Sequence, residues 1–322
     1  MMPFVNAIEI SQLTKIYHAG KGNAPVCAVD HIDLTVAEGE IFGFLGPNGA
    51  GKTTTIHMLT GLTRPTSGQA RVFGLNLATD VTRIKKQIGV VPEVSNLYDE
   101  LSAFDNLVFA MQLYGVPRAE WKPRAEALLT RFRLSEKRNT SFAKLSRGMK
   151  RALTIAAALA HRPSLVFLDE PTTGLDVMSA RNLRQLIARL KGEGVTVFLT
   201  THYLEEAERL CDRIAIIVKG RLVALDTVQG LKAAAPNAPV IEVILADENG
   251  QVETKRITTT VNHNVAEGVS QVLSQAQTES RRVLAVNTAC PTMEDVFVQL
   301  TGLSVAEMLI EKGGKGQNNV GG

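Results

Sequence analysis

Apolar and polar residues alternate early in the chain, and short runs that are apolar throughout follow. Ile32, Leu34 and Val36 alternate with polar neighbours, as expected of a strand buried on one face. A wholly apolar run, residues 41–45, ends at a glycine-rich loop that opens into a helical stretch, residues 52–59. A strand, a glycine loop and a helix in this order are typical of a parallel α/β domain. Further strands are predicted at 7–11 and 26–36.

A mostly helical stretch, about 105–160, follows this opening and is punctuated by Gly115, Pro117 and Pro123. It has the character of an insertion, because the α/β pattern resumes after it with short apolar strands and helices. Strands are predicted at 165–168, 195–200, 214–218 and 222–225, and helices at 180–191 and 204–211.

The pattern changes after Leu231, where residues 233–239 have the composition of a linker. Beyond it the sequence predicts a second, small α+β domain, and the glycine-rich polar residues 312–322 are expected to be disordered. Its elements are strands at 241–245, 252–261 and 283–286, helical spacing between Val265 and Leu273, and a short helix from Pro291. The expected regions are a large α/β domain at 1–235 with a helical subdomain at about 94–160, a small domain at 236–303 and a tail at 304–322.

Composition excludes several classes of protein. The 322 residues carry 35 Lys plus Arg against 32 Asp plus Glu, a formal net charge of +3, and 45% of them are hydrophobic. This balance is neither that of a disordered chain nor that of a membrane protein, and the length suggests about two domains. Such weak basicity gives no electrostatic support for nucleic acid as a partner.

The cellular location expected from the sequence is the reducing cytoplasm. Cys27, Cys211 and Cys290 are odd in number and lie in or beside apolar segments, which favours buried, reduced thiols. The N-terminus lacks the pattern of a secretory signal. The longest apolar stretch, residues 153–160, is far shorter than the roughly 20 residues needed to span a membrane.

A phosphate-binding motif stands between the apolar strand and the helix. The pattern G-x-x-x-x-G-K-[ST] is formed by Gly46, Pro47, Asn48, Gly49, Ala50, Gly51, Lys52 and Thr53. Glycines let several backbone N–H groups converge on a phosphate, and the helix N-terminus adds partial positive charge. Lys52 is suited to the β- and γ-phosphates, and the Thr53 hydroxyl to Mg²⁺.

Two adjacent carboxylates follow the apolar strand 165–168. Asp169 and Glu170 stand at the carboxyl end of a strand, where ligands bind in open α/β sheets. Asp169 can hold Mg²⁺, and Glu170 can act as the general base that polarises the attacking water. Alone, this pair would most often mark a strand that enters a loop; beside a phosphate loop, the functional interpretation is favoured.

A third motif lies between these two in the sequence. Leu145, Ser146, Arg147, Gly148 and Met149 begin a helix whose next turns are apolar, and taken alone Ser146 is simply a good N-cap. The order of the three motifs, however, resembles that of the ATP-binding cassette (ABC) ATPases, the nucleotide-binding subunits of ABC transporters. The resemblance covers roughly residues 8–231.

The resemblance implies an α/β fold: a P-loop NTPase cassette with a RecA-like core, an antiparallel β subdomain and an inserted helical subdomain, here with a small C-terminal α+β domain. It also implies ATP and Mg²⁺ as cofactors and ATP hydrolysis as the activity. The family's signature reads Leu-Ser-Gly-Gly-Gln, so Arg147 and Met149 depart from it, whereas Ser146 and Gly148 are retained. Those two residues are expected to contact ATP bound to an opposing subunit.

Other positions take roles from the family one by one. Tyr17 is similar to the aromatic residue that stacks on adenine, Asp176 lies in the family's D-loop motif, and His202 matches the switch histidine that contacts the γ-phosphate. Glu93 stands where the family has a glutamine, and residues 93–99 are where a membrane partner is expected to dock. Taken singly, Tyr17 is also consistent with an exposed or core tyrosine and Glu93 with a solvated loop carboxylate. A lone histidine such as His202 is more often structural, but the order of the motifs favours the switch role.

The expected site therefore has three sets of residues. Catalytic roles go to Glu170, His202 and Lys52. ATP is expected to contact Tyr17, Gly46, Pro47, Asn48, Gly49, Ala50, Gly51, Lys52, Thr53, Thr54, Glu93, Ser146, Gly148 and Asp176. The metal is expected at Thr53, Asp169 and Glu93.

Three weaker features are similar to ABC-2 type and drug-resistance exporters: Met149 and Lys150 in the signature, the Val-Pro-Glu run ending at Glu93, and residues 291–297. The resemblance thus implies a peripheral subunit on the cytoplasmic face of the inner (plasma) membrane. Its partners would be separate transmembrane permease subunits and a second ATP-binding subunit, most simply in a homodimer, with no nucleic acid. A soluble ABC ATPase acting on ribosomes or nucleic acid, the ATPase of an importer and an ATP-gated scaffold stay as alternatives. The substrate, a heterodimer and the role of the C-terminal domain stay open.

Overall fold

A computed structural model describes residues 6–18, 24–234, 240–246, 251–258, 265–279, 281–289 and 291–309. The chain divides into two compact units, residues 1–225 with 304–322, and residues 226–303. None of the helices in the described ranges is long and apolar enough to cross a membrane.

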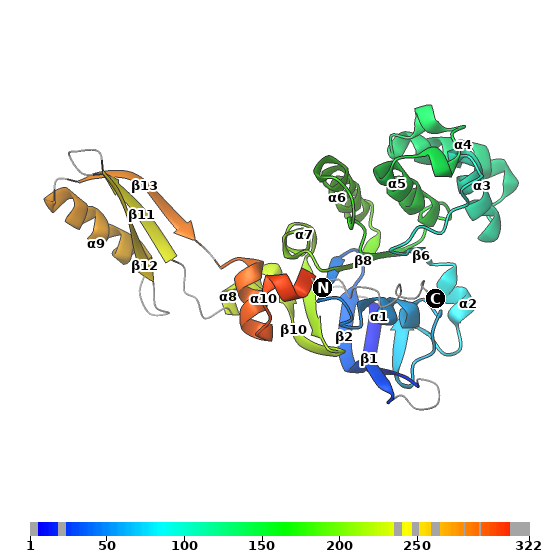
Figure 1. The fold of residues 1–322 in the computed structure, drawn as a ribbon. Helices are drawn as coiled ribbons and strands as arrows, with labels where there is room; N and C mark the ends of the chain where they lie inside the picture. The colour runs from blue at the N-terminus through cyan, green and yellow to red at the C-terminus, as the bar shows by residue number, and fades with distance from the viewer. Residues whose placement is uncertain are drawn as a thin grey trace, which may run out of the picture. The chain divides into compact units, whose positions relative to one another are not determined.

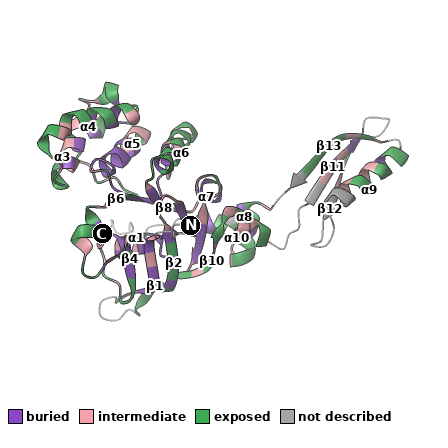
Figure 2. Ribbon diagram, turned by 180° about the vertical axis from the view of Figure 1, so that it is seen from behind, coloured by how far each residue is buried: buried purple, intermediate pink, exposed green. Residues whose placement is uncertain are grey.

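The first unit is built on a six-stranded sheet with the strand order β10-β9-β3-β8-β7-β6 (Figure 1). The strands are β3 (Ile41–Leu45), β6 (Ile88–Val91), β7 (Leu165–Asp169), β8 (Thr196–Thr201), β9 (Arg213–Val218) and β10 (Arg221–Thr227). β3 pairs in parallel with β8 and β9, and β7 pairs in parallel with β6 and β8. Every residue of β3, β7 and β8 is buried, and β8 is coloured as buried in Figure 2. Burial on both faces explains why β3, most of β7 and the centre of β8 are apolar rather than alternating.

A second, antiparallel sheet has the order β2-β1-β4-β5 and shares its core with the first. Its strands are β1 (Asn6–Tyr17), β2 (Val26–Ala37), β4 (Ser67–Val72) and β5 (Leu75–Asn76). Ile32, Leu34 and Val36 are buried as their alternation predicts. β1 is longer than the predicted residues 7–11. Register shifts in its pairing with β2 and β4 interrupt the alternation of apolar and polar residues, so the sequence pattern did not reveal its full length. The sequence analysis also missed β4 and β5.

Aromatic rings bind the centre of the parallel sheet together. The ring of Phe198 on β8 lies 5.6 Å from that of Phe42 on β3 and 5.5 Å from that of Phe167 on β7. Phe198 is also the register partner of both residues. This packing fixes β3 and β7 on either side of β8, so that the loops after all three strands leave the same edge of the sheet.

Helices between β6 and β7 form the inserted region, and they group together in Figure 1. They are α3 (Ala103–Leu113), α4 (Arg118–Arg131) and α5 (Arg147–Ala158). Helix α4 continues through Pro123, so this proline does not interrupt the chain as expected, whereas Gly115 and Pro117 do separate α3 from α4. The other helices of this unit with described bounds are α1 (Lys52–Leu59), α2 (Val81–Lys85), α6 (Val177–Gly192), α7 (Leu204–Leu210) and α11 (Val305–Leu309).

The second unit is a small α+β arrangement of its own. Its antiparallel sheet has the order β12-β11-β13, with β11 (Val240–Ala246), β12 (Val252–Thr258) and β13 (Arg282–Ala289). Helix α9 (Val265–Thr278) packs on it through Val269, Val272 and Ala276. Helices α8 (Val228–Ala234) and α10 (Met293–Thr301) contact each other, and a capping box formed by Thr292 and Asp295 begins α10.

Some expectations differ from the structure or fall outside it. Cys211 is buried, but Cys27 is exposed because it lies near the start of the edge strand β2, before that strand's buried face begins. Part of the expected tail is helical, namely α11. Cys290, most of the linker (235–239), the end of the strand at 252–261 and the residues 312–322 lie outside the described residues.

Candidate nucleotide site

The loop between β3 and α1 approaches neighbouring backbone so closely that side chains do not fit. A Cβ atom at Gly46 would lie 2.2 Å from the carbonyl oxygen of Ile217. Gly51 has a φ of 109°, and a Cβ atom there would lie 2.4 Å from the carbonyl oxygen of Ala28. Glycine is therefore required at both positions for steric reasons as well as by the motif. The tight loop that results lets α1 begin directly at Lys52.

Lys52 is a buried cation whose contacts are supplied by the same chain. Its Nζ donates to the carbonyl oxygens of Gly46 at 2.7 Å and Pro47 at 3.2 Å, and lies 3.0 Å from Glu170 Oε1. The side chains of Lys52 and Glu170 are each 6% exposed. A buried ion pair of this kind places an ammonium group and a carboxylate at one point of the cavity wall.

Glu170 follows β7 in a left-handed conformation, with a φ of 47°. A residue with a Cβ atom adopts this conformation only when its surroundings hold it there. Its backbone N–H donates to the backbone oxygen of Thr200 at 3.2 Å and to the Thr200 hydroxyl at 3.1 Å. His202 Nδ1 lies 2.8 Å from Glu170 Oε2. Burial raises the pKa of Glu170, but His202 and Lys52 outweigh it and hold that pKa below its ordinary value.

Asp169 is placed one residue earlier and is 4% exposed. Its Oδ1 accepts a hydrogen bond from the Thr200 hydroxyl at 2.5 Å. Thr200 thus contacts both carboxylate residues, through the Asp169 side chain and the Glu170 backbone. This arrangement fixes the end of β7 against the end of β8.

A cavity of about 490 Å³ brings most of the predicted site together. It is lined by Ala28, Asn48, Gly49, Gly51, Lys52, Thr53, Thr54, Glu93, Glu170, Thr173 and His202. Ala28 and Thr173 were missed: nothing in the sequence marks Ala28 on distant β2, whereas Thr173 follows Glu170 closely. Its hydroxyl lies 3.4 Å from Glu170 Oε2.

The remaining predicted residues do not line this cavity. They are Tyr17, Gly46, Pro47, Ala50, Ser146, Gly148, Asp169 and Asp176. Tyr17 is 41% exposed, and the Nζ of Lys15 lies 5.0 Å from the centre of its ring. The cavity therefore contains residues of the phosphate loop, the expected base and the expected switch histidine, but neither the signature residues nor the expected adenine contact.

Arg151 on α5 connects these elements and was not predicted. It is 7% exposed and donates to the backbone carbonyls of Pro92, Glu93, Asp169 and Pro171. Burial lowers the pKa of Arg151 to about 10. One guanidinium group thereby joins α5 to the loops after β6 and β7. The sequence shows that Arg151 lies in the helix of the signature motif. It does not show its hydrogen-bond partners, because these are backbone carbonyl groups.

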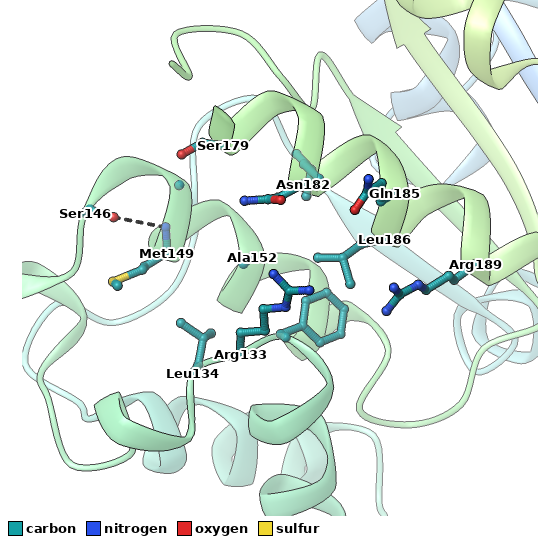
Figure 3. Close-up of a pocket in the computed structure, with 13 residues that line it drawn as sticks. Arg133, Leu134, Ser146, Met149, Ala152, Ser179, Asn182, Gln185, Leu186 and Arg189 are labelled. Atoms are coloured by element: carbon teal, nitrogen blue, oxygen red, sulfur yellow. Dashed lines mark hydrogen bonds between the residues drawn. The ribbon is translucent and has the colours of Figure 1, made fainter. Parts of the chain in front are cut away.

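The signature residues lie at a separate cavity of about 240 Å³ between α5 and α6 (Figure 3). Ser146 caps α5 by accepting a hydrogen bond from the Met149 N–H at 3.3 Å, as its sequence position predicts. Asp176 caps α6 by accepting from the Ser179 N–H at 2.9 Å. A Cβ atom at Gly148 would lie 2.5 Å from Ser179 Oγ, so the two helix N-termini meet closely.

The first cavity has the chemistry of a polyphosphate site. It combines a helix N-terminus, a lysine, a threonine hydroxyl and carboxylates on one wall. Within the described ranges no three His, Cys, Asp or Glu side chains are grouped to hold a metal ion. Mg²⁺ commonly takes only one or two protein ligands beside substrate phosphates, and the hydroxyl of Thr53 and the carboxylate of Glu93 on this wall fit such a role.

Comparison with known proteins identifies the family. The model of the family described as ABC transporter matches residues 29–173. The daunorubicin/doxorubicin resistance ATP-binding protein DrrA of Streptomyces peucetius is 40% identical over 251 residues, 78% of this chain and 74% of that protein. The Nod factor export ATP-binding protein I of Mesorhizobium japonicum is 36% identical over 308 residues, 94% of this chain and 88% of that protein.

A solved ATP-binding cassette, a dimer in a post-hydrolysis state bound to ADP and Pi, superposes with a TM-score of 0.63 at 26% identity. The superposition covers 69% of this chain and 98% of the solved cassette. The predicted fold class, a P-loop cassette of the ABC type, is confirmed. The chain therefore belongs to the ABC transporter family, as an ATP-binding subunit that hydrolyses ATP.

Proposed function

We propose that this protein powers export through separate transmembrane subunits, using ATP hydrolysed at the cavity between β3, β7 and β8. The observation that carries the proposal is the buried Lys52–Glu170 ion pair with His202 beside it on one cavity wall. The names of the two relatives, one for drug resistance and one for export, support export over import or a soluble role. Neither names a ribosomal or nucleic-acid partner.

Glu170 is the general base of the proposed reaction. Because Lys52 and His202 lower its pKa, it is ionised at neutral pH and can accept a proton from the attacking water. His202 is held beside the same carboxylate and would orient it. Lys52 can exchange its contacts with the carbonyls of Gly46 and Pro47 for phosphate oxygens, to which it brings a positive charge.

Mg²⁺ would be held by Thr53, Asp169 and Glu93, and when bound it neutralises charge on the nucleotide phosphates. Thr53 and Glu93 line the cavity directly. Asp169 stands behind them, with its carboxylate oriented by the Thr200 hydroxyl. Glu93 in place of the family's glutamine adds a negative charge here and removes an amide donor.

A second ATP-binding subunit completes the proposed site. Ser146 and Gly148 lie outside the nucleotide cavity of their own chain, which agrees with a role toward nucleotide on a partner. The dimeric state of the similar cassette supports this arrangement, and a homodimer is the simplest form. We place Tyr17 beside the adenine and Asp176 at the dimer interface on the family resemblance.

The proposed location of the protein is the cytoplasmic face of the inner membrane, where it binds a permease subunit. Val94 is 79% exposed and Tyr98 is 51% exposed, so the segment after Glu93 presents apolar side chains to solvent. Exposed apolar side chains beside the nucleotide site favour a docking role for residues 93–99.

The decisive variant is Glu170→Gln. It should bind ATP with nearly unchanged affinity and lose almost all turnover, because the amide cannot accept the proton. Phosphate release and nucleotide binding are measured side by side, with Glu205→Gln, on the exposed face of α7, as the control. Normal hydrolysis by Glu170→Gln would remove this residue from the role of base.

Partners are identified with the same variant. Tagged Glu170→Gln protein is recovered with ATP from mildly solubilised native membranes and analysed by mass spectrometry. Stoichiometric recovery of a polytopic membrane protein without a cassette of its own is the expected result. Recovery of ribosomal or DNA-associated proteins alone would contradict export.

A further inference from the structure

A buried carboxyl group that the proposed reaction does not use lies in α7, close after the switch histidine. Glu206 is 1% exposed and does not line the nucleotide cavity. Its neighbour in sequence, Glu205, is 72% exposed and pairs with Arg209 at the surface. Burying a carboxyl group costs free energy unless its oxygens are engaged, so the position of Glu206 calls for a physical reason.

Glu206 is tied to the residue that precedes His202. Its Oε2 accepts a hydrogen bond from the hydroxyl of Thr201 at 2.8 Å. The same hydroxyl accepts from the N–H of Tyr203 at 3.0 Å. Together the two bonds close a small loop around His202 and fix the backbone on both of its sides.

The loop is also joined to the rest of the site. The backbone oxygen of Thr201 accepts from the N–H of Gly46 at 3.3 Å, and Thr201 is fully buried. His202 in turn lies 2.8 Å from Glu170. A chain of contacts therefore runs from Glu206 through Thr201 and His202 to Glu170, and it is buried at nearly every step.

We propose that Glu206 is a positioning residue for ATP hydrolysis: it holds the Thr201 hydroxyl and so keeps the His202 ring against Glu170. The inference rests on the proposed function, because it assigns a role within that reaction. Without an acceptor at this position, a buried hydroxyl loses its partner and the turn at His202 is no longer fixed. Glu206 itself contacts neither the cavity nor its ligands.

The test compares Glu206→Ala, which removes the acceptor, with Glu206→Gln, whose amide oxygen can still accept from Thr201. Turnover in Glu206→Ala should fall about 10-fold or more, while KM for ATP changes by less than about 2-fold. Glu206→Gln should recover most of the lost turnover. Glu205→Ala, the exposed neighbour on the same helix, should behave as the unaltered protein does.

A double-mutant cycle identifies the partner. Thr201→Val removes the hydroxyl at nearly constant volume and should lower turnover as Glu206→Ala does. The combined variant should be no worse than the more impaired single variant, because both substitutions break the same bond between Thr201 and Glu206. Additive losses would show that the two residues act separately and would overturn the inference.

A purely structural role would look different. In that case turnover would fall in step with Tm, and ATP binding would weaken with it. Three results would overturn the role of Glu206: a loss of turnover that follows Tm, an equal loss of turnover in the Ala and Gln variants, or no loss in either variant. If the unaltered protein hydrolyses ATP and Glu170→Gln does not, the proposed function stands whichever result Glu206 gives.

The dependence of stability on pH gives a second readout. Burial and the charge of Glu170 raise the pKa of Glu206, while the hydroxyls of Thr201 and Thr172 and the charge of Arg184 lower it less. Arg151 and Cys211 are the other titratable groups that interact with it. The folded protein thus keeps this proton to higher pH than the unfolded chain, and stability falls as pH rises through that interval. Glu206→Gln should lack this fall.

Discussion

The two cavities of the cassette differ in where their charges are satisfied. At the phosphate loop, Lys52 and Glu170 form a buried ion pair, and His202 lies beside the same carboxylate. At the signature helix, Ser146 and Asp176 serve as helix caps, and Gly148 leaves room for the facing helix. The first region pairs a buried ammonium group with a buried carboxylate, whereas the second combines helix N-termini with two arginines, Arg133 and Arg189, that line its cavity.

This difference indicates which part of the reaction each region can perform alone. A buried ion pair is costly to form and is preorganised once formed, so a single chain can hold the base and the lysine ready. A helix N-terminus needs no counter-charge and can wait for an anion brought by a partner. Substitutions at the first region should therefore affect binding and chemistry in one chain, and those at the second should affect only paired chains.

The largest effect is expected from Lys52→Ala. This change removes the ammonium group that faces phosphate and leaves Glu170 buried with His202 as its remaining partner. Turnover should fall about 10³-fold, because a buried electrostatic contact to the reacting group is lost. The pKa of Glu170 should rise as well, since Lys52 is one of the groups that lower it. Phosphate release measures the loss, and nucleotide titration shows whether binding falls with it.

Lys85→Ala, an exposed lysine of α2, is the matched control for a lost positive charge. It should leave both quantities unchanged. An equal loss in Lys85→Ala, or full turnover in Lys52→Ala, would show that the buried ion pair does not organise the first region.

Much of this first region could be predicted because its motifs are local. Gly46 to Thr53 are consecutive, and Asp169 and Glu170 end a strand whose five residues are all buried. Parallel strands put their carboxyl ends on one edge, so the placement of both motifs at the same edge of the sheet was predictable once the α/β pattern was recognised. Ala28 could not be found in this way, because it comes from a different sheet through tertiary packing.

The connection that Arg151 makes between the two regions could not be predicted from the sequence, for a different reason. Arg151 reads as one more basic residue of an amphipathic helix, yet it is buried and its partners are main-chain carbonyls. Backbone atoms carry no residue identity, so a sequence pattern cannot reveal them. Glu206 is similar: one of two adjacent glutamates is buried and the other is exposed, and only the packing of α7 distinguishes them.

An intermediate effect is expected from Arg151→Lys. A single ammonium group cannot span the carbonyls of Pro92 and Asp169 as a guanidinium fork does. Buried acceptors left without donors should lower the free energy of unfolding by about 2–3 kcal/mol. Denaturant titration measures this loss. Turnover should fall too, because α5 is no longer fixed to the loops after β6 and β7.

Arg147→Lys is the control on the same helix. Arg147 is exposed and makes one hydrogen bond to the carbonyl of Gly174 at 3.2 Å, so its stability should change by less than about 0.5 kcal/mol. If both variants lost the same stability, the four hydrogen bonds of Arg151 to main-chain carbonyls would not be what joins the two regions.

The smallest effect, and the sharpest test of the comparison, is expected from Ser146→Ala beside Ser102→Ala. Both serines cap a helix, Ser146 by accepting from the Met149 N–H and Ser102 by accepting from the Asp105 N–H. Each substitution should cost about 1 kcal/mol of stability, because each removes one capping bond. Only Ser146→Ala should also lower turnover, and only at protein concentrations where chains pair, while ATP binding to the dilute chain stays unchanged. Weaker ATP binding by dilute Ser146→Ala protein would mean that the signature residues serve their own chain, and the two regions would then differ in charge but not in the partner they serve.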